Sequence, residues 1–466
     1  MNIQFFGAAR NVTGSKHLIT TTKGKRILLD CGMFQGKASQ SGELNRTFGF
    51  NPTEIDFVIL SHAHIDHSGL LPLLVKQGFA GKIFSTSATF DLCAIMLADT
   101  AHIQENDLKY INKRKAKSGE KLLKPLYTID DVQDTLALFE TVDYKKDVQL
   151  TDDFRFRFYN NGHIIGSAAV YIEVKENNEI KKIFFTADIG RLENAILKEP
   201  EAFPQVDYLI TESTYGDREH DGKEMTDEQL LKIVNQTCVE QKGKLIVPAF
   251  SLGRTQEIVY ALDQLEHKGL LPKIKVYVDS PLSTNATNII RRHKECFNEE
   301  LNEYMENDPD PFGFNRLHYV QDVEESKALN DSKEPCIIIS ASGMLEAGRI
   351  KHHVKNNIEN PNNTILMIGY CEPSSLGARL ISGEPEVKIF GDFYKVLAKV
   401  VVIDSFSAHG DYLEMIKYLS CQDSSKIKKT FLVHGEYETQ INFAEKLKKI
   451  GFNDIEIPAL NDSFEL

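Results

Sequence analysis

The sequence lacks the features that mark membrane, secreted and fibrous proteins. None of its apolar runs approaches the roughly 18–20 residues that a membrane span needs. Its first residues, MNIQFFGAAR, contain no basic segment followed by a long apolar one, so we expect no secretory signal peptide. Tandem repeats and low-complexity tracts are also missing, and 42% apolar with 26% charged residues is an ordinary globular composition. We therefore expect a soluble protein with no membrane partner.

Cysteine is sparse and scattered along the chain. Such spacing predicts neither a disulfide framework nor a zinc site built from thiolates, because no two cysteines form a CxxC pair and their number is odd. A reducing compartment fits this pattern, so we expect a cytoplasmic protein. The seven cysteines are Cys31, Cys93, Cys238, Cys296, Cys336, Cys371 and Cys421.

Positive charge is in deficit over the whole chain. There are 54 Lys and Arg against 67 Asp and Glu, a net charge of −13, which argues against a broad nucleic-acid-binding surface. An enzyme acting on phosphodiesters can meet this objection by concentrating positive charge or metal ions in one cleft. The most basic segment is KYINKRKAKSGEKLLK, at residues 109–124. We interpret it as a solvated helix or loop, with an RNA-facing patch as the alternative.

The chain length of 466 residues predicts two or three domains. The first part consists of short runs rich in β-branched and aromatic residues, such as KHLITTT, DFVILS and KKIFFTAD. Between residues 227 and 400, longer helix and strand patterns alternate, which is typical of βαβ units in a mainly parallel sheet. We predict an α/β protein in which an inserted domain, residues 215–398, interrupts an outer domain formed by residues 1–214 and 399–466.

The strongest chemical pattern is LSHAHIDHSG, which begins at the end of the apolar run DFVIL. It places His62, His64, Asp66 and His67, four side chains able to bind a metal, at the end of a predicted strand. Packing does not explain such a cluster, whereas imidazole and carboxylate together suit zinc, with manganese or iron as alternatives. The two-residue spacing puts His62 and His64 on the same side, and Asp66 and His67 can turn toward a neighbouring metal position.

This HxHxDH motif resembles that of the metallo-β-lactamase superfamily. Three further residues match the family in order and context: Asp30 ends the predicted strand KRILLD, His163 lies in NNGHIIGSA, and Asp188 lies in FFTADIG. The resemblance implies an αββα sandwich as the outer domain. It also implies that His163 is the third histidine of a first metal site, that Asp188 bridges two metals, and that Asp30 orients the ligands.

Two metal ions are implied by the same resemblance, with two Zn²⁺ expected and Mn²⁺ or Fe²⁺ as alternatives. Ions that share a hydroxide of lowered pKa and clamp a phosphoryl oxygen suit phosphodiester hydrolysis better than redox chemistry. The resemblance divides the ligands into His62, His64 and His163 on one ion, Asp66 and His67 on the other, and Asp188 between them.

Later motifs resemble those of the β-CASP group within this superfamily. Glu212 lies in TESTYGD, His409 in DSFSAHGD and His434 in FLVHGE. β-CASP proteins are nucleases, and the group contains the endonuclease subunit of the eukaryotic cleavage and polyadenylation specificity factor. A histidine at the last motif is found in RNA-cleaving members, so His434 implies an RNA substrate and completes the second metal site. His409, backed by Glu212, is implied as the acid that protonates the leaving ribose oxygen, and Asp66 is counted with them as catalytic.

The predicted insertion also resembles the β-CASP group, in PAFSLGRTQE, DSPLS, ISASGMLEAGR and GYCEPSSLGARL. The turns ASGM, which holds Ser342 and Gly343, and LGAR could present backbone N–H groups to phosphates. Arg254, Arg349 and Arg379 could add charge-assisted contacts. An ordinary structural role is the equal alternative, because strand-to-helix turns commonly need glycine for conformational reasons alone.

Together these patterns predict a zinc-dependent ribonuclease that cleaves single-stranded RNA to 5′-phosphate and 3′-hydroxyl ends. It is expected to act as an endonuclease and is open to 5′–3′ exonuclease action as well. The alternatives are a hydrolase of another phosphodiester or small ester, and an RNA-binding scaffold without activity. The complete set of ligands argues against the scaffold, because a decayed site would have lost ligands. A homodimer is compatible with the sequence but has no support in it.

Overall fold

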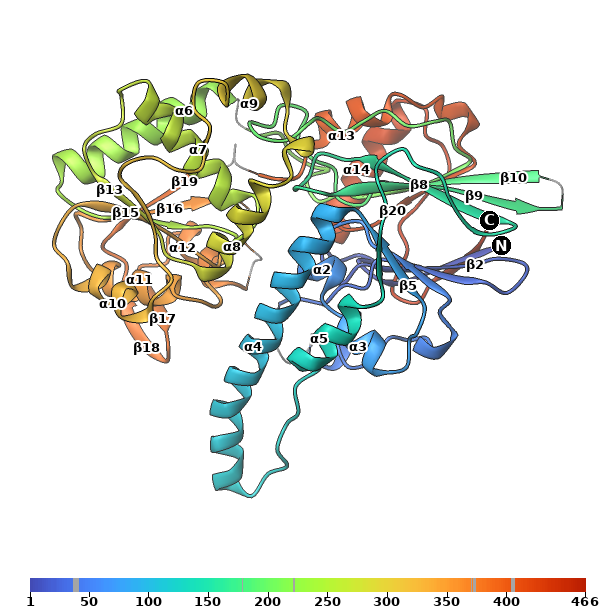
Figure 1. The fold of residues 1–466 in the computed structure, drawn as a ribbon, viewed down its shortest axis with the longest axis horizontal. Helices are drawn as coiled ribbons and strands as arrows, with labels where there is room; N and C mark the ends of the chain where they lie inside the picture. Colours follow the sequence, from blue (N-terminus) through green and yellow to red (C-terminus); the bar gives the residue numbers. More distant parts are fainter. Residues whose placement is uncertain (37–41, 178, 221–222, 370, 372–373, 404–406) are drawn as a thin grey trace. The chain divides into compact units, whose positions relative to one another are not determined.

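The computed structural model separates the chain into two compact units (Figure 1). The first unit comprises Met1–Leu192, Glu199–Glu219 and His409–Leu466, and the second comprises Glu193–Lys198 and His220–Ala408. The structure describes residues 1–36, 42–177, 179–220, 223–369, 371, 374–403 and 407–466. Parts of two motifs, residues 370, 372–373 and 404–406, lie outside the described residues.

Two seven-stranded sheets form the centre of the first unit. In spatial order, the first sheet contains β22 (Ser463–Glu465), β1 (Asn2–Gly7), β2 (Lys16–Thr20), β3 (Arg26–Leu29), β4 (Phe57–Ile59), β5 (Lys82–Ser85) and β6 (Phe139–Thr141). The second contains β21 (Ile455–Glu456), β20 (Lys429–Leu432), β11 (Tyr208–Thr211), β10 (Glu179–Phe185), β9 (Ala168–Glu176), β8 (Phe154–Asn160) and β7 (Val148–Thr151). Both sheets mix antiparallel pairs such as β1–β2 and β8–β9 with parallel pairs such as β3–β4 and β10–β11.

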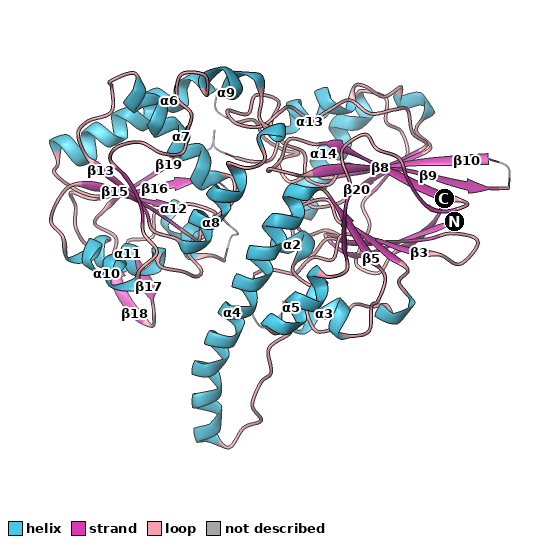
Figure 2. Cartoon of the chain, viewed as in Figure 1, coloured by secondary structure: helices cyan, strands magenta, loops and turns pink. Residues whose placement is uncertain are grey.

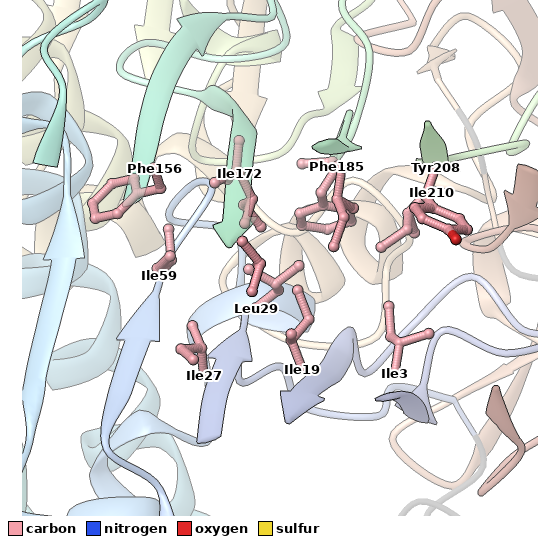
Figure 3. Packing of buried hydrophobic residues seen from close by; sticks show 14 of the residues in the cluster. Ile3, Ile19, Ile27, Leu29, Ile59, Phe156, Ile172, Phe185, Tyr208 and Ile210 are labelled. Carbon is pink, nitrogen blue, oxygen red and sulfur yellow. The ribbon is translucent and has the colours of Figure 1, made fainter. Parts of the chain in front are cut away.

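The two sheets pack face to face through one apolar core. Successive side chains of a strand point to opposite faces, so Ile27 and Leu29 of β3 share the inner face. Figure 3 shows them opposite Ile172 and Phe185 of the second sheet, and these four side chains are almost completely buried. The core therefore holds the strand ends of both sheets in a fixed relation to each other.

Helices cover the outer sides of this sandwich (Figure 2). On the second sheet, Phe184 and Leu209 pack against Met415, Phe443 and other residues of the covering helices. The two covering helices there are α13 (Tyr412–Leu419) and α14 (Tyr437–Lys449), and η5 (Ser424–Lys426) precedes β20. The helices beside the first sheet are η1 (Pro52–Glu54), α2 (Ile65–Ser68), α3 (Leu71–Lys76), α4 (Ser87–Ser118) and α5 (Ile129–Leu136).

A six-stranded sheet, in which every neighbouring pair of strands is parallel, forms the core of the second unit. Its spatial order is β14 (Leu317–Tyr319), β13 (Lys275–Val278), β15 (Cys336–Ser340), β12 (Leu245–Pro248), β16 (Thr364–Ile368) and β19 (Lys399–Ile403), and a separate hairpin joins β17 (Glu386–Ile389) and β18 (Asp392–Lys395). The helices are α6 (Lys223–Val234), η2 (Asn235–Glu240), α7 (Arg254–His267), α8 (Pro281–Ile290), η3 (Lys294–Cys296), α9 (Glu299–Tyr304), α10 (Val323–Asp331), α11 (Ile350–Asn357) and α12 (Leu376–Ile381).

The expected fold class is confirmed: an α/β sandwich accompanies a second unit with a parallel sheet. The first compact unit is interrupted after Glu219 and resumes at His409, whereas the predicted domain limits are residues 214 and 398. Strand β19 pairs with β16, so the second unit runs on to Ala408. In the part of the chain that the structure describes, no helix has both the length and the apolar character that crossing a bilayer demands.

Candidate metal centre

The candidate ligands and the candidate acid of the first unit lie in loops or at the start of a short helix, most of them directly after a strand. His62 and His64 follow β4, and Asp66 and His67 lie in the short helix α2 that begins at Ile65. The other loops contribute His163 between β8 and β9, Asp188 after β10, Glu212 after β11, His409 ahead of α13, and His434 after β20. The sandwich thus brings residues from six loops to one place.

A first group of ligand atoms converges on His64. Its Nδ1 atom lies 3.1 Å from Nε2 of His62 and 3.1 Å from Nε2 of His163. Oδ2 of Asp188 lies 3.5 Å from Nε2 of His62 and 3.4 Å from Nε2 of His163. Three imidazoles and a carboxylate therefore face one another across a very small space.

Burial keeps these three rings neutral. It lowers the pKa of His62 and His163 well below the usual value, and it lowers the pKa of His64 to about 4. Only the neutral imidazole has a lone pair to offer a metal. The first group is thus prepared to donate three nitrogen lone pairs.

A second group forms beside the first. Nε2 of His67 lies 3.2 Å from Nε2 of His434, which in turn lies 3.5 Å from Oδ2 of Asp66. Oδ1 of Asp188 is 3.2 Å from Nε2 of His67. Two imidazoles and two carboxylates therefore make up this second group.

Asp188 connects the two groups through its separate oxygens. Oδ2 faces Nε2 of His62 and Nε2 of His163, whereas Oδ1 faces Nε2 of His67 and lies 3.5 Å from Nδ1 of His434. Oδ1 is buried and accepts no hydrogen bond from any described residue. Burial alone would raise the pKa of Asp188, but the imidazoles of His434 and His67 hold it well below the usual value. A buried, ionised oxygen without a hydrogen bond is costly unless a cation neutralises it.

The spacing of the first group fits a tetrahedral metal. Zinc bonds of 2.0–2.2 Å to nitrogen and oxygen place neighbouring ligand atoms about 3.3–3.6 Å apart. The four measured separations in the first group span 3.1–3.5 Å. The mixed imidazole and carboxylate chemistry is also what zinc, manganese and iron accept. The residues present therefore fit a two-metal centre, and Asp188 lies between the two groups of candidate ligands.

Hydroxyl groups set the tautomers of two ligand rings. The Ser61 hydroxyl donates to Oδ2 of Asp30 at 2.9 Å and lies 3.0 Å from Nδ1 of His62. Because its single hydrogen is already used, Ser61 accepts from Nδ1–H, and Nε2 of His62 keeps its lone pair. Thr214 repeats this arrangement: its hydroxyl donates to the carbonyl of His434 at 3.1 Å and lies 3.0 Å from Nδ1 of that ring.

Asp30 orients the second group from behind. It is fully buried, and its Oδ2 lies 2.7 Å from Nδ1 of His67. The same carboxylate accepts the Ser61 backbone N–H at 2.8 Å and the Ser15 hydroxyl at 3.2 Å. A carboxylate behind a ligand ring fixes its orientation and makes it a stronger base.

Three residues of the site have a left-handed backbone. Asp30 has φ of 60°, Ala187 has 48° and His434 has 50°. Such conformations are unfavourable for residues other than glycine and persist where the surrounding structure enforces them. His434 belongs to the second group of candidate ligands, Asp30 lies behind His67, and Ala187 immediately precedes Asp188.

Close backbone approach at Gly190 holds the Asp188 loop against its neighbours. The Gly190 N–H donates to the carbonyl of Asn161 at 2.7 Å, and a Cβ at Gly190 would lie only 2.0 Å from the carbonyl of Gly162. On the other side, Gly190 forms a β-bridge with His409. The glycine therefore lets the loops that carry His163, Asp188 and His409 meet.

Glu212 and His409 form a pair at the edge of the metal centre. Nδ1 of His409 lies 3.0 Å from Oε2 of Glu212, and the Ile189 backbone N–H bonds to Oε1 of the same carboxylate. Nε2 of His409 lies 4.0 Å from Oδ2 of Asp188, and 18% of the His409 side chain is exposed. Burial disfavours the charged ring, yet Glu212 outweighs it, so the pKa of His409 is raised.

The arginines predicted to contact substrate from the second unit have partners within the protein. Arg254 is buried and pairs with Glu257, and Arg379 pairs with Glu384 at 2.7 Å. Arg349 pairs with Asp279 at 2.6 Å.

The two glycine-rich turns there also have internal hydrogen bonds. The Ser342 hydroxyl accepts the backbone N–H groups of Glu346 and Ala347 at 3.2 and 3.3 Å. In the other turn, Leu376 N–H donates to Glu346, and Gly377 N–H donates to the carbonyl of Met344, next to Gly343. These bonds favour the ordinary structural role, and a role of the turns in phosphate binding stays a prediction.

Ser61 and Thr214 have roles in the site that the sequence patterns do not predict. Both lie inside motifs of the sequence, LSHAHIDHSG and TESTYGD. The only sign of these roles in the sequence is a hydroxyl side chain next to a predicted site residue. The direction of each hydroxyl, which decides the tautomer, depends on a carboxylate or carbonyl distant in sequence or on the loop conformation.

Family models account for most of the chain. Residues 18–212 match a metallo-beta-lactamase superfamily domain, residues 255–380 a Beta-Casp domain, and residues 394–458 a Zn-dependent metallo-hydrolase RNA specificity domain. The fold and the paired ligand groups thus define a metallo-hydrolase of the β-lactamase type.

Curated relatives narrow this class. The chain is 34% identical to "Ribonuclease TTHA0252" of Thermus thermophilus, over 94% of each protein. It is 32% identical to "RNase J-like protein" of Methanocaldococcus jannaschii, over 96% of this chain and 95% of the relative. It is 30% identical to "Transcription termination factor FttA" of Methanosarcina mazei, over 96% of this chain and 69% of the relative. The chain belongs to the β-CASP group of the metallo-β-lactamase superfamily, as its motifs predicted.

Proposed function

We propose that the chain is a zinc-dependent ribonuclease that hydrolyses phosphodiester bonds of single-stranded RNA. The observation that carries this proposal is Asp188, whose two oxygens face two separate groups of buried ligands. Two relatives that match over nearly their whole length are named as a ribonuclease and an RNase J-like protein. The RNA specificity domain model at residues 394–458 supports the same substrate.

The ligand chemistry supports two zinc ions, with manganese or iron as alternatives. We assign His62, His64 and His163 to one ion, Asp66, His67 and His434 to the other, and Asp188 to both. Two bound ions supply an acidified water and polarise a phosphoryl oxygen. The chain itself supplies nitrogen donors of His62 and His434, whose Nδ1 atoms face the hydroxyls of Ser61 and Thr214, and a His67 ring backed by Asp30.

His409 is the group suited to move a proton during cleavage. Glu212 binds Nδ1–H, so the second proton of the imidazolium is carried at Nε2. Nε2 lies on the side of Asp188, beside the metal centre, and can reach a scissile phosphate there. We propose that it protonates the 3′ oxygen of the leaving ribose, which produces 3′-hydroxyl and 5′-phosphate ends. Asp66, on the opposite ligand group, helps to hold the attacking water in place.

We propose that one domain is inserted into another. Residues 1–214 and 399–466 would form the metallo-β-lactamase domain around a β-CASP domain at 215–398, which the matches at 18–212, 255–380 and 394–458 support. We also place the activity in the cytoplasm, because all seven cysteines are free.

The proposed substrate contacts are Arg254, Ser342, Gly343 and Arg379. If they bind RNA, Arg379→Gln should weaken RNA binding and leave the metal content unchanged.

The decisive experiment uses metal-loaded protein and one RNA labelled at either the 5′ or the 3′ end, together with DNA of the same sequence. We expect RNA to be cut to 5′-phosphate products and DNA to be cut far more slowly. Fragments of intermediate length from both labels indicate endonuclease action, and release of mononucleotides from the 5′ label indicates exonuclease action. RNA that is bound but never cut by protein with full metal content would contradict the proposal and support an inactive scaffold.

A further inference from the structure

The second half of helix α4 leaves the body of the first unit. The buried residues of α4 lie between Ala88 and Ala101. From His102 to Leu126, a stretch that the structure describes completely, no residue is buried. Figure 1 shows this half of α4 and the chain that returns from it extending beyond the sheets of their own unit. We call residues 102–126 the α4 arm.

The α4 arm has no apolar core of its own, and polar contacts hold it together. The Asn112 side chain donates to the carbonyl of Leu123 at 2.9 Å and accepts its N–H at 2.8 Å. At the base of the arm, the Leu126 N–H donates to the Gln104 side chain at 3.1 Å. The helix ends at Ser118, and the φ of 73° at the following Gly119 permits the chain to turn back. The arm is therefore a folded hairpin whose surface residues are not required for packing.

The outer part of the α4 arm is strongly basic. Residues 109–124 contain seven basic side chains and one acidic one, a net charge of +6 in a chain of net charge −13. Of the seven, Lys115 has an ion-pair partner, Glu120 at 2.7 Å. The others form no ion pair with any described residue: Lys109, Lys113, Arg114, Lys117, Lys121 and Lys124.

Helix stability does not account for this charge. Basic residues favour a helix only within its last turn, which here contains Lys115 and Lys117. Lys109, Lys113 and Lys117 are spaced four residues apart, so they stand one above another on one face and repel. Lys121 and Lys124 follow the end of the helix altogether. The charge must therefore be neutralised by something outside the chain or left as a repulsive surface.

An exposed aromatic side chain interrupts the basic face. Tyr110 is 75% exposed, and Lys113, Arg114 and Lys117 follow it at three, four and seven residues, on adjoining turns. Proteins that bind single-stranded nucleic acid combine a basic track for the phosphates with aromatic rings on which bases stack. The arm combines both kinds of group on one helix.

We propose that the α4 arm is a second RNA-binding site, which contacts phosphates through Lys109, Lys113 and Lys117 and stacks a base on Tyr110. The proposal rests on the proposed ribonuclease function and names where the substrate is held away from the metal centre. A second copy of the chain is the competing occupant, since Leu122 and Leu123 are also exposed. Two arms that each carry a charge of +6 repel, however, whereas a polyanion is attracted.

The test compares Lys109→Gln/Lys113→Gln/Lys117→Gln with a control of equal charge, Lys23→Gln/Lys145→Gln/Lys428→Gln, which changes exposed lysines outside the arm. Binding to a fluorescent single-stranded RNA is measured by anisotropy over a range of salt, with His409→Ala added to each protein to prevent cleavage. Each lost phosphate contact reduces the salt slope by about 0.7 on a log–log scale, so the arm variant should lose about 2 and the control almost none. Tyr110→Ala should weaken binding about tenfold, and Tyr110→Phe should restore it.

Cleavage assays distinguish a failure of the RNA-binding proposal for the arm from a failure of the proposed ribonuclease function. With His409 present, the arm variant should hydrolyse bis(p-nitrophenyl) phosphate, which is too small to reach both sites, at the wild-type rate, while its KM for long RNA rises about tenfold. If wild type cuts RNA and the arm variant shows an unchanged salt slope and KM, the arm does not bind RNA. A loss of dimers in light scattering, with unchanged RNA binding, would assign the arm to self-association instead. If wild type itself fails to cut RNA, the proposed function fails.

Discussion

Nδ1 of His409 lies 3.0 Å from Oε2 of Glu212, while Nε2 of the same ring lies 4.0 Å from the carboxylate of Asp188. The ring therefore has one nitrogen held by a buried carboxylate and the other on the side of the ligand groups. His434, by contrast, has Nε2 3.2 Å from Nε2 of His67, and its Nδ1 lies 3.0 Å from the Thr214 hydroxyl and 3.5 Å from Oδ1 of Asp188. The two histidines, both at the ends of strands in the sequence patterns, thus occupy different chemical positions.

Removal of His409 should separate proton transfer from metal binding. We expect His409→Ala to retain its metal and to lose about 10²–10⁴-fold in RNA cleavage rate, the contribution of a positioned acid. An RNA with sulfur in place of the scissile 3′ oxygen should recover part of this loss, because a thiolate leaves without a proton. His318→Ala, which removes an exposed histidine of β14, serves as the control and should change neither property. Loss of metal from His409→Ala would show that His409 is a ligand.

Asp30→Asn tests the orientation of His67. The substitution keeps the shape of the side chain but removes the charge that His67 faces at 2.7 Å. We expect metal affinity to fall about 10–100-fold, as for other carboxylates behind ligand rings. A chelator competition assay measures this change, and Asp152→Asn, at an exposed carboxylate, should match wild type. Equal affinities for all three proteins would mean that Asp30 does not support the metal centre.

Gly190→Ala should disturb the site through the backbone. A methyl group there would lie 2.0 Å from the Gly162 carbonyl, so the loops of His163 and Asp188 must move apart. We expect a loss of about 1–3 kcal/mol in the free energy of unfolding, together with weaker metal binding. Gly42→Ala is the matched control, because nothing lies within 4 Å of its Cβ position, and it should stay within about 0.5 kcal/mol of wild type. Denaturant unfolding measures the free energy of unfolding of both variants, and metal titration measures their metal binding. Equal values for Gly190→Ala and Gly42→Ala would contradict the prediction.

Asp263 of α7 should make the stability of the second unit depend on pH. Burial raises the pKa of its carboxyl group from 3.8 to about 7 against the hydrogen bond from Tyr304, and Asp308, Glu266 and Asp310 add to the increase. Folding therefore favours the protonated form. Its contribution is fully present below the unfolded-state pKa and declines as the pH rises from about 4 to 7.

Asp263→Asn should flatten this dependence. We expect its melting temperature to fall less steeply than that of wild type between pH 4 and 7. Asp392→Asn, an exposed carboxylate in the same unit, should keep the wild-type slope. Scanning calorimetry at several pH values measures the slopes, and identical slopes for wild type and Asp263→Asn would refute the prediction.

Most of the candidate site residues could be predicted from the sequence, but the contacts that orient them could not. His62, His64, Asp66 and His67 were predictable because they are neighbours in the chain. Asp188 and the other distant residues could be placed with them only through the family resemblance, since nothing in the spacing of the residues shows which loops meet.

The remaining features depend on three-dimensional contacts. The tautomers set by Ser61 and Thr214 require the position of hydrogen-bond partners across loops. The ion pairs of Arg254 and Arg379 with nearby glutamates also became visible only once the helices and turns of the second unit were placed. The basic segment at 109–124 was recognised in the sequence, but its exposure depends on where α4 stops packing.

If two metal ions that share Asp188 cut RNA, cleavage must depend on both ions and on this carboxylate. The experiment strips the protein with a chelator and measures RNA cleavage as zinc or manganese is added back, in wild type and in Asp188→Ala. We predict no cleavage without metal, a rise in rate that ends at two equivalents, and no recovery in Asp188→Ala at any stoichiometric load. Cleavage of RNA by metal-free wild type, or an Asp188→Ala protein as active as wild type, would show that a metal pair at Asp188 does not perform the cleavage.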